Sequence, residues 1–205
     1  MDQFRSMEEL LAAVPSRDNY SFHIETKYQS KIKLFAPHGG CIEPCTSHIV
    51  MSLATGTYDS YIFNGIRKKE CFKNLHVTST NYDEPHCLMM ARDSEMAISV
   101  HGCNDSDDHI QIGGGNKAAA AKLADCLTTN GYVVVTPSDD LQGANPKNFI
   151  NLSRRKGIQL ELSVGFRKNL FPSFPKSIQK DPKQFDRFIK TMRNWLDEMD
   201  RQIQD

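Results

Sequence analysis

The sequence predicts an α/β fold: a three-layer α/β/α arrangement around a mostly parallel or mixed central sheet. Short runs rich in apolar and β-branched residues alternate with longer segments of helical periodicity, which is the pattern of βαβ units. The chain has 205 residues, and two separate cores would each lie near the lower limit of domain size. We therefore predict a single domain over residues 1–205.

Six short segments have the composition of strands. Each is an apolar or β-branched run, too short for a helix of ordinary length. The predicted strands span Lys31–Ala36, Tyr58–Phe63, Leu75–Thr78, Ala97–Val100, Tyr132–Thr136 and Ile158–Ser163.

Four segments between and after these strands are predicted as helices. One follows a Gly-Gly turn, one follows Pro85, and the third ends at Asn130-Gly131. The last carries an apolar stripe at three- and four-residue spacing, which indicates core packing. The predicted helices span Glu43–Leu53, His86–Arg92, Asn116–Thr129 and Asp181–Gln204. Residues 105–108 and 113–115 are predicted as loop beside a cleft, and the triple glycine lacks the lysine of a P-loop.

Composition excludes several classes of protein. The 25 basic and 25 acidic residues cancel, so we expect no nucleic-acid partner. No apolar run approaches the roughly 20 residues needed to span a bilayer, and the N-terminus lacks the pattern of an export signal. We therefore expect cytoplasmic synthesis, no membrane association and, by default, a monomer. The six cysteines are interpreted as reduced thiols.

Two His-Gly pairs, each directly after a predicted strand, indicate a metal site. His38-Gly39-Gly40-Cys41-Ile42-Glu43 follows the strand at 31–36, and His101 follows the strand at 97–100. Two imidazoles and a carboxylate are a ligand set for Zn²⁺ with one position open. We predict that His38, Glu43 and His101 bind zinc, with manganese or cobalt as alternatives. A Cys41-x-x-x-Cys45 pair with the two histidines would instead form a closed structural site.

A hydrolytic metal site also needs a base. Glu161 stands in an otherwise apolar predicted strand, where an ionisable residue is costly unless it faces a polar site. We predict that Glu161 is the catalytic base; the alternative is a glutamate on an edge strand facing water. Arg154, Arg155 and Arg167 flank this strand and are candidates for binding a substrate carboxylate or polarising a carbonyl. The spacing does not distinguish between them, and the basic stretch can also be a solvated face.

Four ordered segments resemble the phage poly-γ-glutamate hydrolases. They are residues 36–44 (APHGGCIEP), 75–85 (LHVTSTNYDEP), 99–102 (SVHG) and 157–163 (GIQLELS). The resemblance implies a zinc-peptidase-like fold similar to metallocarboxypeptidases, zinc on His38, Glu43 and His101, and a catalytic glutamate at Glu161. It also marks His76, which is a candidate for contacting substrate or supporting the metal ligands, or a buried histidine bonded to backbone. Cys45 and His48 depart from the glycine and glutamate that the resemblance leads us to expect, and Cys41 and Cys103 stand beside expected ligands.

The leading hypothesis is a zinc-dependent hydrolase of γ-glutamyl amide bonds in poly-γ-glutamate, an anionic polymer. In the biological context that the resemblance implies, a phage of a bacillus removes the host's capsule, and the enzyme acts outside the cell after lysis. One alternative is a metallo-carboxypeptidase or amidase acting on small γ-glutamyl or peptidoglycan peptides, which would need an anchor for a terminal carboxylate. Another is a non-catalytic metal-binding or DNA-associated phage protein.

Overall fold

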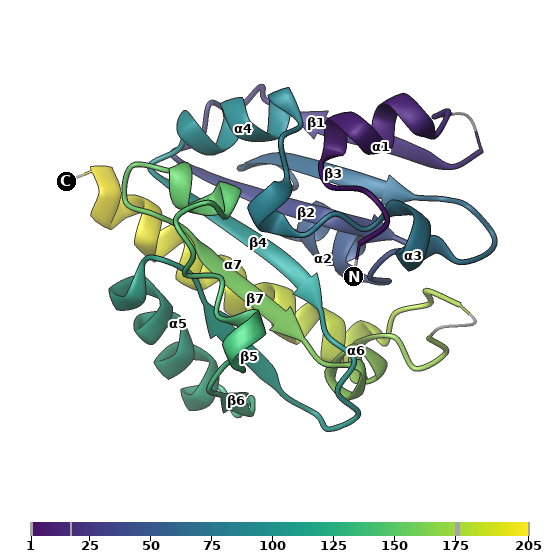
Figure 1. Ribbon diagram of the computed structural model, residues 1–205. Helices are drawn as coiled ribbons and strands as arrows, with labels where there is room; N and C mark the ends of the chain where they lie inside the picture. The colour runs from purple at the N-terminus through teal and green to yellow at the C-terminus, as the bar shows by residue number, and fades with distance from the viewer. Residues whose placement is uncertain (1, 17, 175–176, 205) are drawn as a thin grey trace.

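The computed structural model describes residues 2–16, 18–174 and 177–204, and its strands and helices alternate along the chain (Figure 1). The strands are β1 (Tyr20–Glu25), β2 (Ile32–Gly40), β3 (Asp59–Gly65), β4 (Met96–Gly102), β5 (Ile110–Gly113), β6 (Val134–Val135) and β7 (Ile158–Leu162). The α-helices are α1 (Met7–Ala13), α2 (Thr46–Ala54), α3 (Cys71–Leu75), α4 (Pro85–Arg92), α5 (Lys117–Thr129), α6 (Val164–Leu170) and α7 (Pro182–Gln204). Short 3₁₀ helices are η1 (Ser79–Asn81), η2 (Asp139–Leu141) and η3 (Phe149–Leu152).

The strands in the described residues form one mixed sheet in the order β1-β3-β2-β4-β7-β5-β6. The four central strands, β3, β2, β4 and β7, are parallel to one another. β1 pairs antiparallel with β3 at one edge, while β5 pairs antiparallel with β7 and carries β6 at the other. The prediction of a mixed sheet within an α/β fold is therefore confirmed.

Two apolar cores lie on opposite faces of the sheet and give the three layers (Figure 1). Helices α2, α5, α6 and α7 cover one face, and α1, α3, α4 and η3 cover the other. Alternate residues of a strand supply the two cores: Leu34 and Ala36 of β2 pack into the first, while Phe35 packs into the second. This alternation places His101, which follows Val100 of the first core, on the second face.

A bulge interrupts the pairing of β2 with β3. Ala36 pairs with Ile62 and Gly39 with Asn64, so Pro37 and His38 together stand opposite the single residue between those partners. A bulge re-aims the side chain it carries and is one of the places in a strand that tolerate proline. It therefore sets the direction of His38.

Some predicted elements are wrong. Residues 75–78 form no strand, because Leu75 ends α3 and the chain then runs extended into η1. Leu75 and Val77 are both buried in the second core, which gives strand-like alternation without a pairing partner. The loop expected over 105–108 and 113–115 is interrupted by β5, which includes Gly113, and the strand expected over 132–136 shortens to Val134–Val135.

The expectation that all cysteines are reduced is also wrong. Cys41 and Cys71 form a disulfide across 30 residues of sequence, with their Cα atoms 5.7 Å apart. Cys45, Cys87, Cys103 and Cys126 are free thiols. The approach of the two Cα atoms, which a disulfide requires, is a property of the fold that spacing in sequence does not reveal. Among the described helices, none is long and apolar enough to cross a membrane.

Candidate active site

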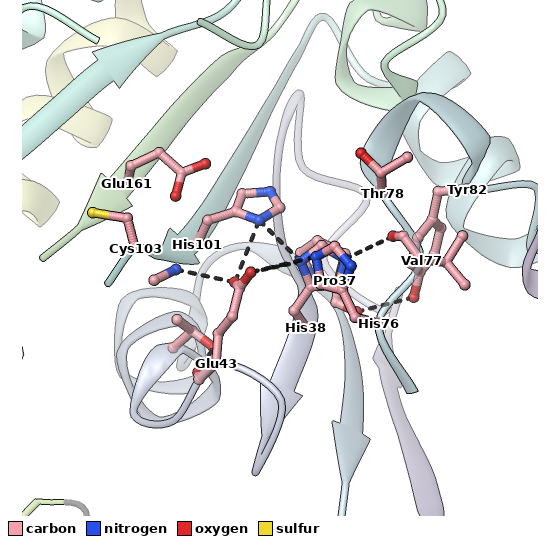
Figure 2. Close-up of polar contacts among 12 residues, drawn as sticks. Pro37, His38, Glu43, His76, Val77, Thr78, Tyr82, His101, Cys103 and Glu161 are labelled. Carbon is pink, nitrogen blue, oxygen red and sulfur yellow. Dashed lines mark hydrogen bonds and ion pairs between the residues drawn. The ribbon is translucent and has the colours of Figure 1, made fainter. Parts of the chain in front are cut away.

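Three neighbouring parallel strands, β2, β4 and β7, deliver polar side chains to the same edge of the sheet. His38 comes from the bulge in β2, His101 from the end of β4 and Glu161 from β7 (Figure 2). Glu43 follows β2 in the turn before α2. Ligands of open α/β sheets bind at the carboxyl ends of the strands, and here these residues line a cavity of about 620 Å³.

A tight turn brings Glu43 back toward His38. The Glu43 amide donates to the His38 carbonyl at 2.8 Å, and the Cys41 amide donates to the Gly65 carbonyl at 2.9 Å. Gly40 has a φ of +64°, and a side chain there would collide with the backbone of Gly65. The two glycines thus let the six residues from His38 to Glu43 fold so that both side chains face one point.

His38, Glu43 and His101 converge closely. His38 Nδ1 lies 3.0 Å from Glu43 Oε1 and 3.1 Å from His101 Nδ1, and His101 Nδ1 lies 3.4 Å from Glu43 Oε2. All three residues are buried. The structure therefore brings the three predicted ligands together.

The surrounding hydrogen bonds favour a cation among these atoms. His38 Nε2 is 2.8 Å from the Val77 carbonyl, which accepts a hydrogen bond only if that nitrogen carries the proton. In the neutral ring Nδ1 is then a lone-pair donor to a metal, and it faces a second imidazole nitrogen and a carboxylate. Glu43 Oε2 is also fixed, because it accepts from the Gly102 amide at 3.0 Å. This donor set and its supporting bonds fit Zn²⁺.

Electrostatics at the site follow from burial and proximity. Burial opposes ionisation of Glu43, but His38 and His101 outweigh it and hold the pKa of Glu43 well below its ordinary value. For His101, burial favours the neutral ring, but Glu43 and Glu161 reverse this and raise its pKa. The neighbourhood thus attracts positive charge to the point where the three side chains meet.

His76 lies at the same site but is bound differently. It stacks between Phe72 and His38, with ring centroids 4.3 and 4.1 Å away. Its Nδ1 is 2.7 Å from Asp2 Oδ1, and its Nε2 is 3.8 Å from Glu43 Oε1. His38, Glu43 and His76 form a second trio with one donor atom each within 4.8 Å of the others, although His101 approaches Glu43 more closely than His76 does, at 3.4 Å against 3.8 Å. Burial, followed by the charge of His38, lowers the pKa of His76 to about 4.

Glu161 stands opposite His101 across the β4–β7 pairing, with its carboxylate beside the imidazole (Figure 2). It is buried, lines the cavity, and accepts a hydrogen bond from Gln159 Nε2 at 2.8 Å. Burial raises the pKa of Glu161 to about 7, although the neighbouring His101 opposes the shift. A buried carboxyl with a pKa near neutrality, beside a candidate metal ligand, is suited to proton transfer.

The three candidate arginines lie outside the cavity lining as far as the structure describes it. Arg154 and Arg155 precede β7 and so lie at the amino end of the strand, away from the cavity. Their exposed side chains pair with Glu95. Arg167 is on the correct side, but its guanidinium is buried and bonded elsewhere. The structure therefore brings none of them to the point where the metal-site residues meet.

Arg167 instead joins the segments that follow the site residues. Its Nη1 donates to the Pro44 carbonyl at 3.0 Å and its Nη2 to the Cys103 carbonyl at 2.9 Å. Its Nε donates to the carbonyls of Leu162 at 3.1 Å and Ser163 at 3.4 Å. These acceptors lie one or two residues after Glu43, His101 and Glu161. A single guanidinium thus holds together the three chain segments that carry the site.

Only part of the remaining cavity lining could be predicted from the sequence. It includes the hydroxyl residues Thr78–Thr80, which belong to the segment around His76, and Asn104. It also includes residues 139–145 with Asn148, which carried no signal of function in the sequence. Within the described residues no lysine or arginine lines the cavity, whereas Asp139 and Asp140 add acidic groups near its rim.

The free cysteines have separate surroundings. Cys45 packs in the first core, and burial raises the pKa of its thiol to about 12. Its φ of +85° is in the region that favours glycine, the residue expected there from the sequence resemblance. Cys103 lines the cavity. The alternative of a closed zinc site on Cys41 and Cys45 is wrong, because Cys41 is bonded to Cys71 and Cys45 packs in that core.

Sequence comparisons identify relatives over most of the chain. A family model described as poly-gamma-glutamate hydrolase matches residues 4–191. The SPbeta prophage-derived UPF0714 protein YoqZ of Bacillus subtilis (strain 168) is 35% identical over 177 residues, which cover 84% of this chain and 63% of that protein. The UPF0714 protein YndL of the same organism is 36% identical over 177 residues, covering 84% of this chain and 68% of YndL. The chain thus spans less than two thirds of the length of YoqZ.

Solved structures share the fold. A structure of a bacteriophage poly-gamma-glutamate hydrolase has a TM-score of 0.89 at 25% identity, covering 97% of this chain and 98% of the other. A structure of YNDL described as apo and zinc-free has a TM-score of 0.88 at 34% identity, with 96% and 98% coverage. An N-formylglutamate amidohydrolase from Ralstonia eutropha JMP134 has a TM-score of 0.60 at 8% identity, covering 91% of this chain and 99% of the other, which extends the likeness in fold alone.

Proposed function

The chain belongs to the poly-gamma-glutamate hydrolase family, and from that premise we propose that it is a zinc-dependent hydrolase of γ-glutamyl amide bonds in poly-γ-glutamate. The observation that carries the proposal is the convergence of His38 Nδ1, His101 Nδ1 and the Glu43 carboxylate within 3.0 to 3.4 Å, with Glu161 beside them. The description of a related structure as zinc-free supports zinc as the metal.

In this proposal His38, Glu43 and His101 hold the metal, which supplies Lewis acidity toward water and the scissile carbonyl. Glu161 accepts a proton from the attacking water at its carboxylate and returns it to the leaving nitrogen. Its burial and its hydrogen bond to Gln159 keep the carboxylate directed into the cavity. The Val77 and Gly102 backbone groups hold His38 and Glu43 in the orientation that the metal requires.

Recognition of the anionic polymer then depends on uncharged donors. The hydroxyls of Thr78, Ser79 and Thr80 and the amide of Asn104 line the cavity and bind the α-carboxylates in this proposal. The same lining disfavours a carboxypeptidase acting on small γ-glutamyl peptides, since such an enzyme anchors a terminal carboxylate, and a cationic anchor is missing from the described lining.

The polymer's chain length tests the proposal. Purified protein is incubated with poly-γ-glutamate alone, with a chelator, and with the chelator followed by excess zinc. We expect rapid shortening that the chelator abolishes and zinc restores. Unchanged polymer, with zinc shown to be bound, would contradict the proposed substrate. The prophage-derived relative YoqZ is consistent with a phage context, in which the protein acts as a single catalytic domain on a bacterial capsule after lysis.

A further inference from the structure

Three buried polar side chains form a chain of hydrogen bonds that ends on Glu161. Asn148 Nδ2 donates to Gln159 Oε1 at 2.8 Å, and Gln159 Nε2 donates to Glu161 Oε1 at 2.8 Å. Asn148, Gln159 and Glu161 are 3%, 6% and 4% exposed. A buried amide stays where its donors and acceptors are satisfied, so each member restricts the next.

The direction of this chain is fixed at its far end. The side chain of Asn148 caps η3, because its Oδ1 accepts from the Ile150 amide at 3.4 Å. With the oxygen committed to the helix, the nitrogen of Asn148 must face Gln159 Oε1. The Gln159 amide is then oriented with its nitrogen toward Glu161, and the reversed amide would place an oxygen against the carboxylate.

The backbone around Gln159 leaves this side chain little room. Gly143 has a φ of +61°, and a Cβ there would lie 2.8 Å from Gln159 Oε1. Gln159 Nε2 also lies 3.5 Å from the Leu141 carbonyl. The segment 139–145, which lines the cavity, therefore packs directly onto Gln159.

We propose that Gln159 is a positioning residue: it fixes one carboxylate oxygen of Glu161 so that the other is presented to the cavity, and Asn148 sets the sense of its amide. The inference rests on the proposed function for the role of Glu161, but the geometry it describes is independent of the substrate. Gln159 and Glu161 are two residues apart in β7, so the proposed base and its positioning residue lie on the same face of the sheet, the face that α4 covers.

The test uses Gln159→Met, which removes the donor at similar volume, and Asn148→Asp, which keeps a good helix cap but removes the donor to Gln159. The matched control is Gln111→Met. Gln111 is also a buried glutamine and stands opposite Glu161 across the β5–β7 pairing, but its amide bonds to Ser138 and His109.

We expect Gln159→Met and Asn148→Asp to lower kcat on poly-γ-glutamate by about 10- to 100-fold, the range for groups that orient a metal-site residue. Bound zinc should stay within about twofold, because neither residue touches the proposed ligands, and KM should change much less than kcat, because the groups proposed to bind the substrate carboxylates, Thr78–Thr80 and Asn104, are left intact. In a Glu161→Gln background, Gln159→Met should cause no further loss, since a residue that acts through Glu161 has nothing left to position. Gln111→Met should leave kcat within about twofold. Equal losses of kcat in the presence and absence of the Glu161 carboxylate would overturn the proposal.

A crystal structure of Gln159→Met provides a readout that needs no activity. We expect the Glu161 carboxylate to leave its position or to occupy several rotamers, with the β7 backbone unchanged. If wild-type protein fails to cut the polymer but the carboxylate moves in the variant, the substrate assignment fails and the positioning role stands. If the carboxylate stays in place, the positioning role is wrong whatever the substrate.

Discussion

A disulfide joins Cys41 to Cys71 and ties the turn between His38 and Glu43 to the first residue of α3. Phe72 lies in this helix and His76 follows it; the ring of His76 stacks on Phe72 and also packs against His38. The disulfide therefore completes a continuous set of contacts that runs from the candidate metal site through the turn and α3 and back to His38.

Removing this bond should lower stability. A cross-link that closes a loop of 30 residues is worth about 3.6 kcal/mol, so Cys41→Ser with Cys71→Ser should lower Tm by about 7 to 14 °C. Calorimetry with and without a reducing agent checks this: reduction should destabilise wild-type protein and leave the double variant unchanged. Cys126→Ser, which removes a free thiol, is the control. A reductant-insensitive Tm in wild-type protein would show that the bond does not form.

The two trios of possible ligands make different predictions for zinc. His101→Ala should weaken zinc binding by more than the roughly 100-fold upper range of outer-shell changes, because His101 Nδ1 lies 3.1 Å from His38 Nδ1 and 3.4 Å from Glu43 Oε2. His76→Ala, removing a ring whose Nδ1 bonds Asp2, should change zinc affinity by less than about tenfold. Competition against a chromophoric chelator measures both, with circular dichroism to confirm folding. The reverse order of effects would assign the metal to His38, Glu43 and His76.

Glu161→Gln separates binding from catalysis. The amide keeps the shape of the side chain but cannot accept a proton, so kcat should fall by at least about 100-fold. Zinc content should remain equal to that of wild-type protein. Retained activity in this variant would exclude Glu161 as the base.

The acidic cavity lining predicts an unusual salt dependence for an enzyme acting on a polyanion. Added salt screens repulsion between the substrate and Asp139 and Asp140, so KM should fall or stay constant from about 0.02 to about 0.3 M salt. Asp139→Asn with Asp140→Asn should lower KM at low salt, whereas Asp125→Asn with Glu198→Gln, on exposed helix positions remote in the fold, should not. A KM that rises steeply with salt would instead indicate binding by arginine or lysine.

Arg167→Lys should destabilise the protein and loosen the site. Lysine has one ammonium group and cannot reach carbonyls on three separate segments, so we expect a loss of about 2 to 4 kcal/mol in the free energy of unfolding. The control is Arg193→Lys: Arg193 also donates to carbonyls, of Ser52 and Thr55, but its contacts lie at the end of α2, away from the cavity. Denaturant unfolding measures both. Equal losses in the free energy of unfolding for the two variants would show that Arg167 contributes no more to stability than an arginine remote from the cavity.

Much of the fold could be predicted from the sequence because the patterns that indicate it lie within single segments of the chain. The central strands and α5 and α7 show clear periodicity, and His38, Glu43 and His101 each come after a strand predicted from the sequence. Glu161 was identifiable because a carboxylate is costly within an apolar strand. These are properties of a segment and its immediate neighbours.

The features that were missed depend on contacts between distant segments. β1 is a mostly exposed edge strand, and β5 has only four residues, so neither shows a strong apolar pattern. Arg154, Arg155 and Arg167 all flank β7 in sequence. Arg154 and Arg155 precede the strand, however, so they lie at the end of the strand that is remote from the cavity. The disulfide and the Asn148–Gln159–Glu161 chain likewise require knowledge of which loops meet.

Every acceptor of the Arg167 guanidinium is a main-chain carbonyl. Because these hydrogen bonds are made to the backbone, they depend on the course of the main chain and not on the identity of the side chains along it. Residues 44, 103, 162 and 163 can therefore be exchanged without removing an acceptor, and the cavity walls beyond them can be rebuilt around an unchanged frame. This makes the molecule a candidate scaffold for engineering hydrolases of other amide polymers, with Arg167 held constant during selection.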